Sequence, residues 1–82
     1  MKDRIVILKT FLGTTKPKKN TAAREDYWKL IGQKGKVIDD PLANDRVLVL
    51  FESDLDNYQV ENHNPIKNSL WIRITDLELK NE

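Results

Sequence analysis

The chain of 82 residues lacks cysteine altogether, and it has one histidine and three glycines. Without cysteine it can form neither a disulfide nor a cysteine-based zinc site, and it has no thiol nucleophile. Long apolar runs are also missing, since the run Ile5–Leu8 stops at Lys9, short of a signal-peptide core or a membrane-spanning helix. We therefore expect no membrane contact and a cytoplasmic location.

The length leaves room for one domain, residues 1–82, because domains usually hold about 100–200 residues. A chain this short buries only about 60–65% of its unfolded surface, so its core has to be compact. Two Trp, two Tyr and two Phe are the only large aromatic side chains available to fill it. We expect a monomer, with self-association through an uncovered edge strand as the alternative.

The formal net charge of +1 hides an asymmetry between the two halves of the chain. Residues 1–36 hold ten basic side chains and three acidic ones, a net charge of +7. Residues 37–82 hold four basic and ten acidic side chains, a net charge of −6. Such a division can indicate a basic surface that binds nucleic acid. In the other interpretation the two halves interleave in space, so that each basic group faces an acid.

Short segments with β-branched residues and alternating apolar positions predict a chain made of strands. In the last long segment, Leu70, Ile72 and Ile74 are expected to point inward, whereas Trp71 and Arg73 point outward. The predicted strands are Arg4–Leu12, Lys36–Asp39, Arg46–Glu52, Tyr58–Glu61, Ser69–Thr75 and Glu78–Lys80.

The stretch between the first two predicted strands has a different composition. Gly13–Arg24 holds three Thr, three Lys, one Asn and one Pro and predicts a long exposed loop with three lysines at its tip. For Ala22–Ile31 two interpretations remain, because Thr21 could cap a short helix whereas Tyr27–Ile31 has the composition of a strand. An irregular turn that leads into a short strand is favoured.

Two motifs carry a resemblance to a known family. The sequence GQKGKV at 32–37, followed by a hairpin into 46–50, resembles the GxxGxV element of KOW motifs and related SH3-like barrels. The segment 70–79 is similar to the end of such barrels, where a strand enters a short helical turn and then a closing strand. The resemblance implies an all-β fold, a small SH3-like barrel of five to six short antiparallel strands with a long basic loop after the first.

The GxxGxV element also has a physical interpretation. One glycine can take a positive φ, the other allows a close backbone approach, and Val37 re-enters the core. The ALYDY stretch of peptide-binding SH3 domains is missing and no proline follows Trp71, so recognition of proline-rich peptides is not expected.

Groups suited to catalysis or metal binding are scarce. His63 lies in a predicted loop, and neither Ser53 nor Ser69 belongs to a nucleophile-elbow motif. The acids between 39 and 56 could converge, but Asp54–Tyr58 lacks the glycine and the third ligand of an EF-hand loop. We expect no catalytic residue, no metal site and no cofactor, and thus a protein that is not an enzyme.

The remaining candidates are aromatic and basic side chains. Phe11, Phe51 and Trp28 lie in apolar runs and are expected in the core. A non-catalytic module that docks a protein or peptide partner on an aromatic and charged rim is the favoured function, and its candidate residues are Tyr27, Trp28, Tyr58 and Trp71. The alternative is KOW-like binding of RNA or another nucleic acid, with the candidate residues Lys16, Lys18, Lys19, Arg24, Lys34 and Lys36.

Overall fold

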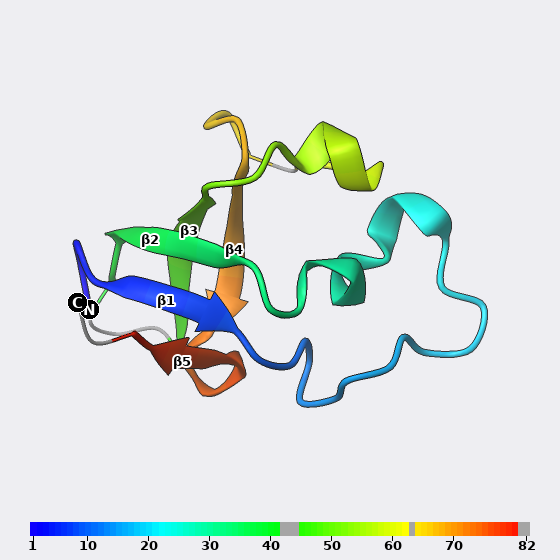
Figure 1. Ribbon diagram of the computed structural model, residues 1–82, viewed down its shortest axis with the longest axis horizontal. Coiled ribbons are helices and arrows are strands. Elements are labelled where there is room, and N and C mark those ends of the chain that lie inside the picture. The colour runs from blue at the N-terminus through cyan, green and yellow to red at the C-terminus, as the bar shows by residue number, and fades with distance from the viewer. Residues whose placement is uncertain (42–44, 63, 81–82) are drawn as a thin grey trace.

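In the part of the chain that the structure describes, five antiparallel strands form one sheet in the order β4-β3-β2-β1-β5 (Figure 1). The structure, a computed structural model, describes residues 1–41, 45–62 and 64–80. The predicted all-β class is confirmed, and β4 and β5 form the two edges of the sheet. The strands are β1 Ile5–Leu8, β2 Lys34–Asp39, β3 Arg46–Phe51, β4 Ser69–Arg73 and β5 Leu77–Leu79.

Four short 3₁₀ helices connect the strands, and no helix in the described residues is long and apolar enough to cross a membrane. The helix η4 links β4 directly to β5, as the resemblance implied for the end of the chain. The connection between β1 and β2 holds two of the helices and extends to one side of the sheet (Figure 1). The helices are η1 Ala23–Glu25, η2 Tyr27–Leu30, η3 Leu55–Tyr58 and η4 Ile74–Asp76.

Two predicted strands are wrong. In place of a strand over Tyr27–Ile31, residues 27–30 form η2, in which Tyr27, Trp28 and Leu30 are buried and Lys29 is exposed. This order suits one helical turn and not the strict alternation of a strand. Tyr58–Glu61 is not a strand either, because Tyr58 ends η3 and Gln59 turns the chain with a φ of +59°.

Other strand ends also differ from the prediction. β1 stops at Leu8, because the N–H groups of Lys9 and Thr10 donate to the Asp76 carbonyl at 2.9 and 3.4 Å. Ile74 was expected inside, yet it begins η4 and is 38% exposed. The outward orientation of Trp71 is confirmed by its exposure.

The core is formed where the apolar positions of neighbouring strands meet. Val6 and Leu8 of β1 and Val37 of β2 are at most 1% exposed. Leu30 of η2 and Leu55 of η3 complete this core from the connections. Phe51 and Trp28 are buried as expected, whereas Phe11 is only partly buried.

The two glycines of the GxxGxV element act as the sequence predicted. Gly32 has a φ of +93°, and Val37 is fully buried. A Cβ on Gly35 would lie 2.7 Å from Val49 Cγ1 and 2.9 Å from the Leu50 carbonyl oxygen. Gly35 therefore allows β2 and β3 to approach each other.

Gly35→Ala should lower the free energy of unfolding by about 1–3 kcal/mol, because the added methyl group meets backbone that cannot move alone. Chemical denaturation measures this change. The control, Lys36→Ala on the same strand, should change stability by about 0.5 kcal/mol or less. A Gly35→Ala variant as stable as the wild type would contradict the close approach.

Candidate docking site

The chain after β1 forms a tight two-residue hairpin turn. The Phe11 N–H donates to the Thr14 carbonyl at 2.8 Å, and the Thr14 N–H donates back at 3.1 Å. Between them Leu12 and Gly13 have φ values of +51° and +79°, as in a type I′ turn. A leucine rarely adopts a positive φ, so an outside interaction has to hold this turn in place.

That interaction comes from the carboxylate of Asp76 in η4, which is 1% exposed. It accepts hydrogen bonds from Thr10 Oγ1 at 2.6 Å, from the Gly13 N–H at 2.9 Å and from the Leu12 N–H at 3.1 Å. Hydrogen bonds to a charged acceptor are stronger than those between neutral groups. Asp76 thus fastens the turn to the end of the sheet and fixes where Phe11 lies.

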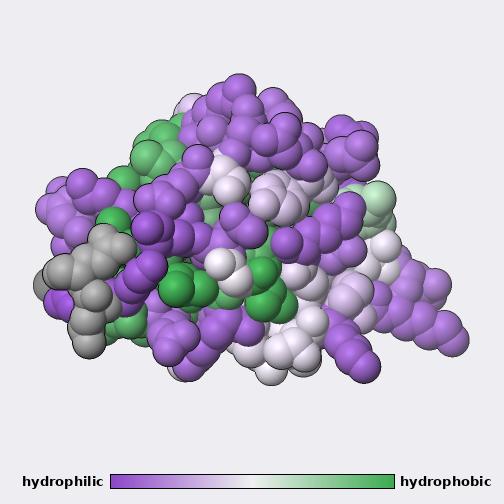
Figure 2. All heavy atoms as spheres, viewed as in Figure 1, coloured by the Kyte–Doolittle hydropathy of each residue, from purple (hydrophilic) through white to green (hydrophobic). Residues whose placement is uncertain are grey.

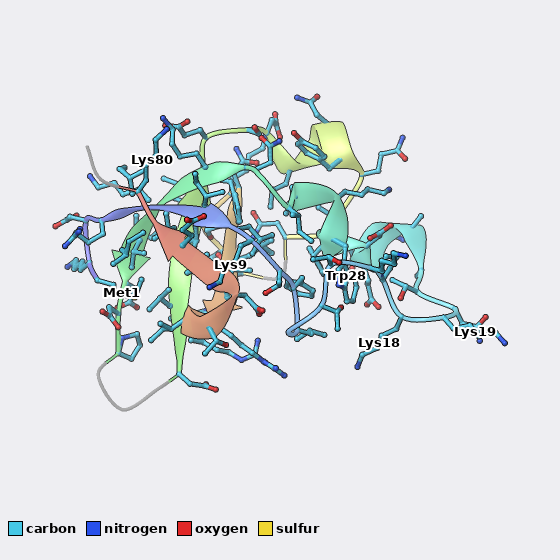
Figure 3. All side chains as sticks on the ribbon, turned by 60° about the horizontal axis from the view of Figure 1, so that its bottom comes forward. Met1, Lys9, Lys18, Lys19, Trp28 and Lys80 are labelled. Carbon is cyan, nitrogen blue, oxygen red and sulfur yellow. The ribbon has the colours of Figure 1, made fainter. Side chains whose placement is uncertain are left out.

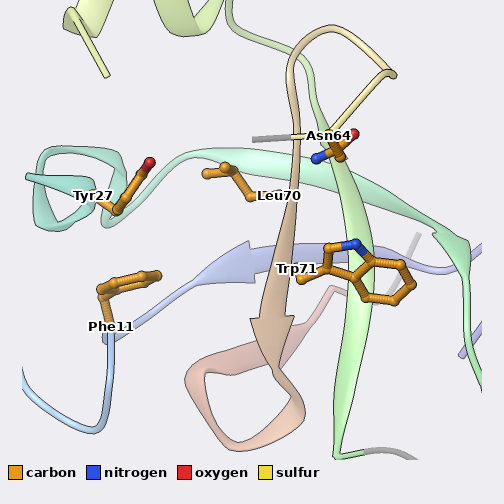
Figure 4. Close-up of a pocket in the computed structure, with 5 residues that line it drawn as sticks. All are labelled: Phe11, Tyr27, Asn64, Leu70 and Trp71. Atoms are coloured by element: carbon orange, nitrogen blue, oxygen red, sulfur yellow. The ribbon is translucent and has the colours of Figure 1, made fainter. Parts of the chain in front are cut away.

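An apolar cavity of about 190 Å³ lies between this turn and β4 (Figure 4). Phe11 and Tyr27 form one wall, and Leu70 points towards them from β4. Trp71 also lines the cavity, but its indole ring points away from Phe11 and Tyr27. The Phe11 and Tyr27 rings pack with their centroids 5.3 Å apart. Asn64, which also lines the cavity, is held by donating its side-chain amide to the Ser69 carbonyl at 2.7 Å.

A second hollow of about 360 Å³ adjoins the first, because Phe11 and Tyr27 line both. Trp28 lines it too, with its ring edge-on to Phe11 at a centroid distance of 5.0 Å. The Trp28 indole N–H donates to Thr14 Oγ1 at 2.9 Å. Lys18 brings a cation to its rim, so apolar walls and a charged rim occur together. We call the surface formed by Phe11, Tyr27, Trp28, Leu70 and Trp71 the aromatic groove.

The structure brings together three of the four predicted partner-binding aromatics. Tyr27 and Trp28 are each 8% exposed, whereas Trp71 is 38% exposed. Tyr58, at the end of η3, packs against the core and lines neither cavity. Elsewhere on the face seen in Figure 2 the surface is mostly hydrophilic, with apolar side chains only in small areas.

Phe11 and Leu70 are groove residues that the sequence assigned to the core. Their strand-like patterns gave no sign of a cavity. The only local signal was Gly13, which permits a turn at the point where the predicted first strand was drawn through to Leu12.

Tyr27 is held by its environment in the neutral form. Its hydroxyl donates to the Glu61 carbonyl at 2.8 Å. Burial raises the pKa of Tyr27, and the negative charges of Glu25 and Glu61 raise it further. The hydroxyl therefore works as a hydrogen-bond donor at neutral pH.

The six candidate nucleic-acid residues come from separate places. Lys16, Lys18 and Lys19 are exposed in the connection between β1 and β2, and Figure 3 shows Lys18 and Lys19 at its tip. The other three face acids, so the charges of the chain partly interleave. The pairs are Arg24 with Glu61 at 2.7 Å, Lys34 with Glu52 at 3.8 Å and Lys36 with Asp3 at 3.8 Å.

No group of three or more His, Asp or Glu side chains in the described part of the chain is placed to hold a metal ion. His63 lies outside the described residues. In comparisons with known proteins, no family model, no curated protein and no solved structure matches this chain.

Asp76→Ala should lower the free energy of unfolding by about 2–4 kcal/mol, because three donors lose their acceptor at once. The amide protons of Leu12 and Gly13 should also exchange faster with solvent, as NMR would measure. Thr75→Ala is the control on the same helix, since Thr75 is exposed. If the two amides kept their protection in Asp76→Ala, the carboxylate would not be what holds the turn.

Tyr27→Phe should change how stability depends on pH. Because the pKa is raised in the folded state, the unfolded chain loses its phenolic proton first, starting near pH 10. The stabilisation by neutral Tyr27 is therefore complete below about pH 10 and is lost as the pH rises towards the folded-state pKa. Wild type should lose more stability than Tyr27→Phe in this window, as denaturation at several pH values would show. Tyr58→Phe controls for the loss of a tyrosine, and parallel curves for wild type and Tyr27→Phe would contradict the shift.

Proposed function

We propose that this chain is a small SH3-like barrel that docks a protein or peptide partner in the aromatic groove. The observation that carries the proposal is the pair of adjoining cavities that share Phe11 and Tyr27, the first of which the exposed Trp71 also lines. Aromatic side chains dominate many docking surfaces, since each contributes a large area at a small entropic cost. The strand order, with η4 between β4 and β5, supports the SH3-like and KOW-like assignment.

The groove is suited to binding because its walls are already fixed. Hydrogen bonds from Tyr27 and Trp28 hold the rings of one wall, and the Asp76 carboxylate holds the turn that carries Phe11. A preformed surface loses little conformational entropy when a partner binds. We further propose a non-catalytic role without a cofactor, for a monomer in the cytoplasm.

Nucleic-acid binding is the alternative proposal. It is favoured by Lys16, Lys18 and Lys19, for which the described residues provide no ion pair. It is disfavoured by the acids that face Arg24, Lys34 and Lys36, because a phosphate would have to displace them.

Trp71→Ala should weaken binding of the partner about thirtyfold, the effect of truncating a tryptophan at the centre of an interface. The test is affinity capture with the wild type and the variant, with recovered proteins quantified by mass spectrometry. Ile74→Ala is a matched control, because Ile74 is also 38% exposed and lies just beyond β4. Ile74→Ala should recover the same proteins as wild type, and equal recovery by Trp71→Ala would contradict the proposal.

Titration of a labelled single-stranded RNA at several salt concentrations tests the alternative proposal, nucleic-acid binding. If all six cations met phosphates, the logarithm of the affinity would fall with the logarithm of salt concentration with a slope of roughly −4. That result, together with loss of binding in the Lys18→Ala, Lys19→Ala double variant, would favour nucleic acid over a protein partner.

A further inference from the structure

The edge of the sheet at β4 carries backbone groups that face away from β3. The N–H of Phe51 donates to the Asn68 carbonyl, and the N–H of Ile74 donates to the Asp45 carbonyl, both at 2.9 Å. Along β4, residues whose N–H and C=O groups face β3 alternate with residues whose groups face away from it. Because Asn68 and Ile74 bond towards β3, Trp71, which pairs with Leu48, and Arg73, which pairs with Arg46, belong to the set that faces away. The N–H and C=O groups of Trp71 and the N–H of Arg73 therefore point to the free edge.

Only the start of this edge is covered in the described part of the chain. The Ser69 carbonyl accepts hydrogen bonds from the side-chain amides of Asn62 at 3.0 Å and Asn64 at 2.7 Å. Across residues 1–41, 45–62 and 64–80, no hydrogen bond outside the β3–β4 ladder and the η4 helix involves the Trp71 backbone or the Arg73 N–H. Such an edge is a template for one further strand.

The free edge is also one side of the apolar cavity. Figure 4 shows β4 with Leu70 and Trp71, and Phe11 and Tyr27 across the cavity from it. A peptide that pairs with this edge presents alternate side chains to the two faces of the sheet. One of these side chains would enter the cavity, so the backbone contacts and the apolar contact are met by the same segment.

Charge indicates what else the segment carries. Arg73 lies directly opposite Arg46, in a pair that does not exchange hydrogen bonds and whose side chains are therefore close. No ion pair of Arg73 occurs in the described part of the chain. An acidic side chain on an added strand would lie beside Arg73 and supply the opposite charge.

Resting on the proposed docking function, we infer that the occupant of the aromatic groove is an extended, acidic peptide segment. It adds as a strand to the free edge of β4, with an apolar side chain between Phe11, Tyr27 and Leu70. An acidic side chain of the same segment pairs with Arg73.

Arg73→Pro tests the edge directly. Arg73 has a φ of −62°, which proline adopts without strain, and its N–H is not part of the β3–β4 pairing. The substitution therefore removes one edge donor and places a ring in the path of an added strand while leaving the sheet intact. Arg73→Ala is the matched control, because it removes the charge and keeps the N–H.

The probe is a linear dodecapeptide selected on the wild-type protein from a random display library, then synthesised with a fluorescent label. Arg73→Pro should weaken binding of this peptide about tenfold or more, because the hydrogen bond from the Arg73 N–H is lost and the peptide carbonyl that accepted it is left unpaired. Arg73→Ala should weaken binding only about two- to fivefold, as for an exposed ion pair. Fluorescence anisotropy measures both affinities, and NMR spectra establish that each variant is folded.

If Arg73→Pro fails to fold, single N-methylation of each peptide amide decides instead. Binding should be lost at alternate positions, because only every second amide faces β4. Tolerance of methylation at every position would overturn strand addition.

Four other results overturn the inference and are distinguishable. A selected peptide that needs Trp71 but binds Arg73→Pro as wild type excludes strand addition and leaves the docking function standing. A peptide indifferent to both Trp71→Ala and Arg73→Pro contradicts the docking function as well. Selection of basic peptides contradicts the acidic segment, and failure to enrich any peptide excludes a linear occupant.

Discussion

The candidate docking site depends on one buried carboxylate. Asp76 lies in the single 3₁₀ turn between β4 and β5, and it accepts three hydrogen bonds from the turn that follows β1. The connection from residue 9 to residue 33 contains only two short 3₁₀ helices and no strand, so few local interactions order it. Ordering a chain segment costs conformational entropy at every residue, and Asp76 offsets part of this cost at the position that carries Phe11.

The same contact explains why a leucine tolerates a left-handed conformation. A non-glycine residue with a positive φ costs about 1–2 kcal/mol, and Leu12 has a φ of +51°. In return, the N–H groups of Leu12 and Gly13 converge on the carboxylate, which would be costly to bury without donors. Backbone strain of this kind persists where the surroundings hold it, and it is common at binding sites.

The sequence predicted the parts of the fold that local patterns determine. β1, β3 and β4 were predicted near their positions, because alternation of β-branched residues depends only on near neighbours. The turn at Leu12 was missed because its acceptor, Asp76, lies 63 or more residues away in sequence. Likewise, η2 has the composition of a strand, and the packing of its Tyr27 and Trp28 against Phe11 is a contact that the local pattern does not show.

The sequence left two interpretations of its charge asymmetry, a basic surface or halves that interleave in space. Arg24 faces Glu61 and Lys34 faces Glu52, both from the second half, so the charges of the two halves interleave at these residues. Three lysines of the connection stay outside the described ion pairs because that connection extends away from the sheet.

The two edges of the sheet differ in how they are protected against further pairing. β5 is only three residues long, so few of its backbone groups are available for pairing with a further strand. The N–H of the next residue, Lys80, donates to the Ile5 carbonyl of β1 at 3.0 Å. β4 is longer, with five residues, and its only protection within the described residues is the amide pair at Ser69 and the charge of Arg73. A charge on an edge strand repels a second copy of itself but attracts an opposite charge. In the strand addition proposed above, the same arginine would therefore disfavour pairing with a second copy of this edge and favour an acidic strand.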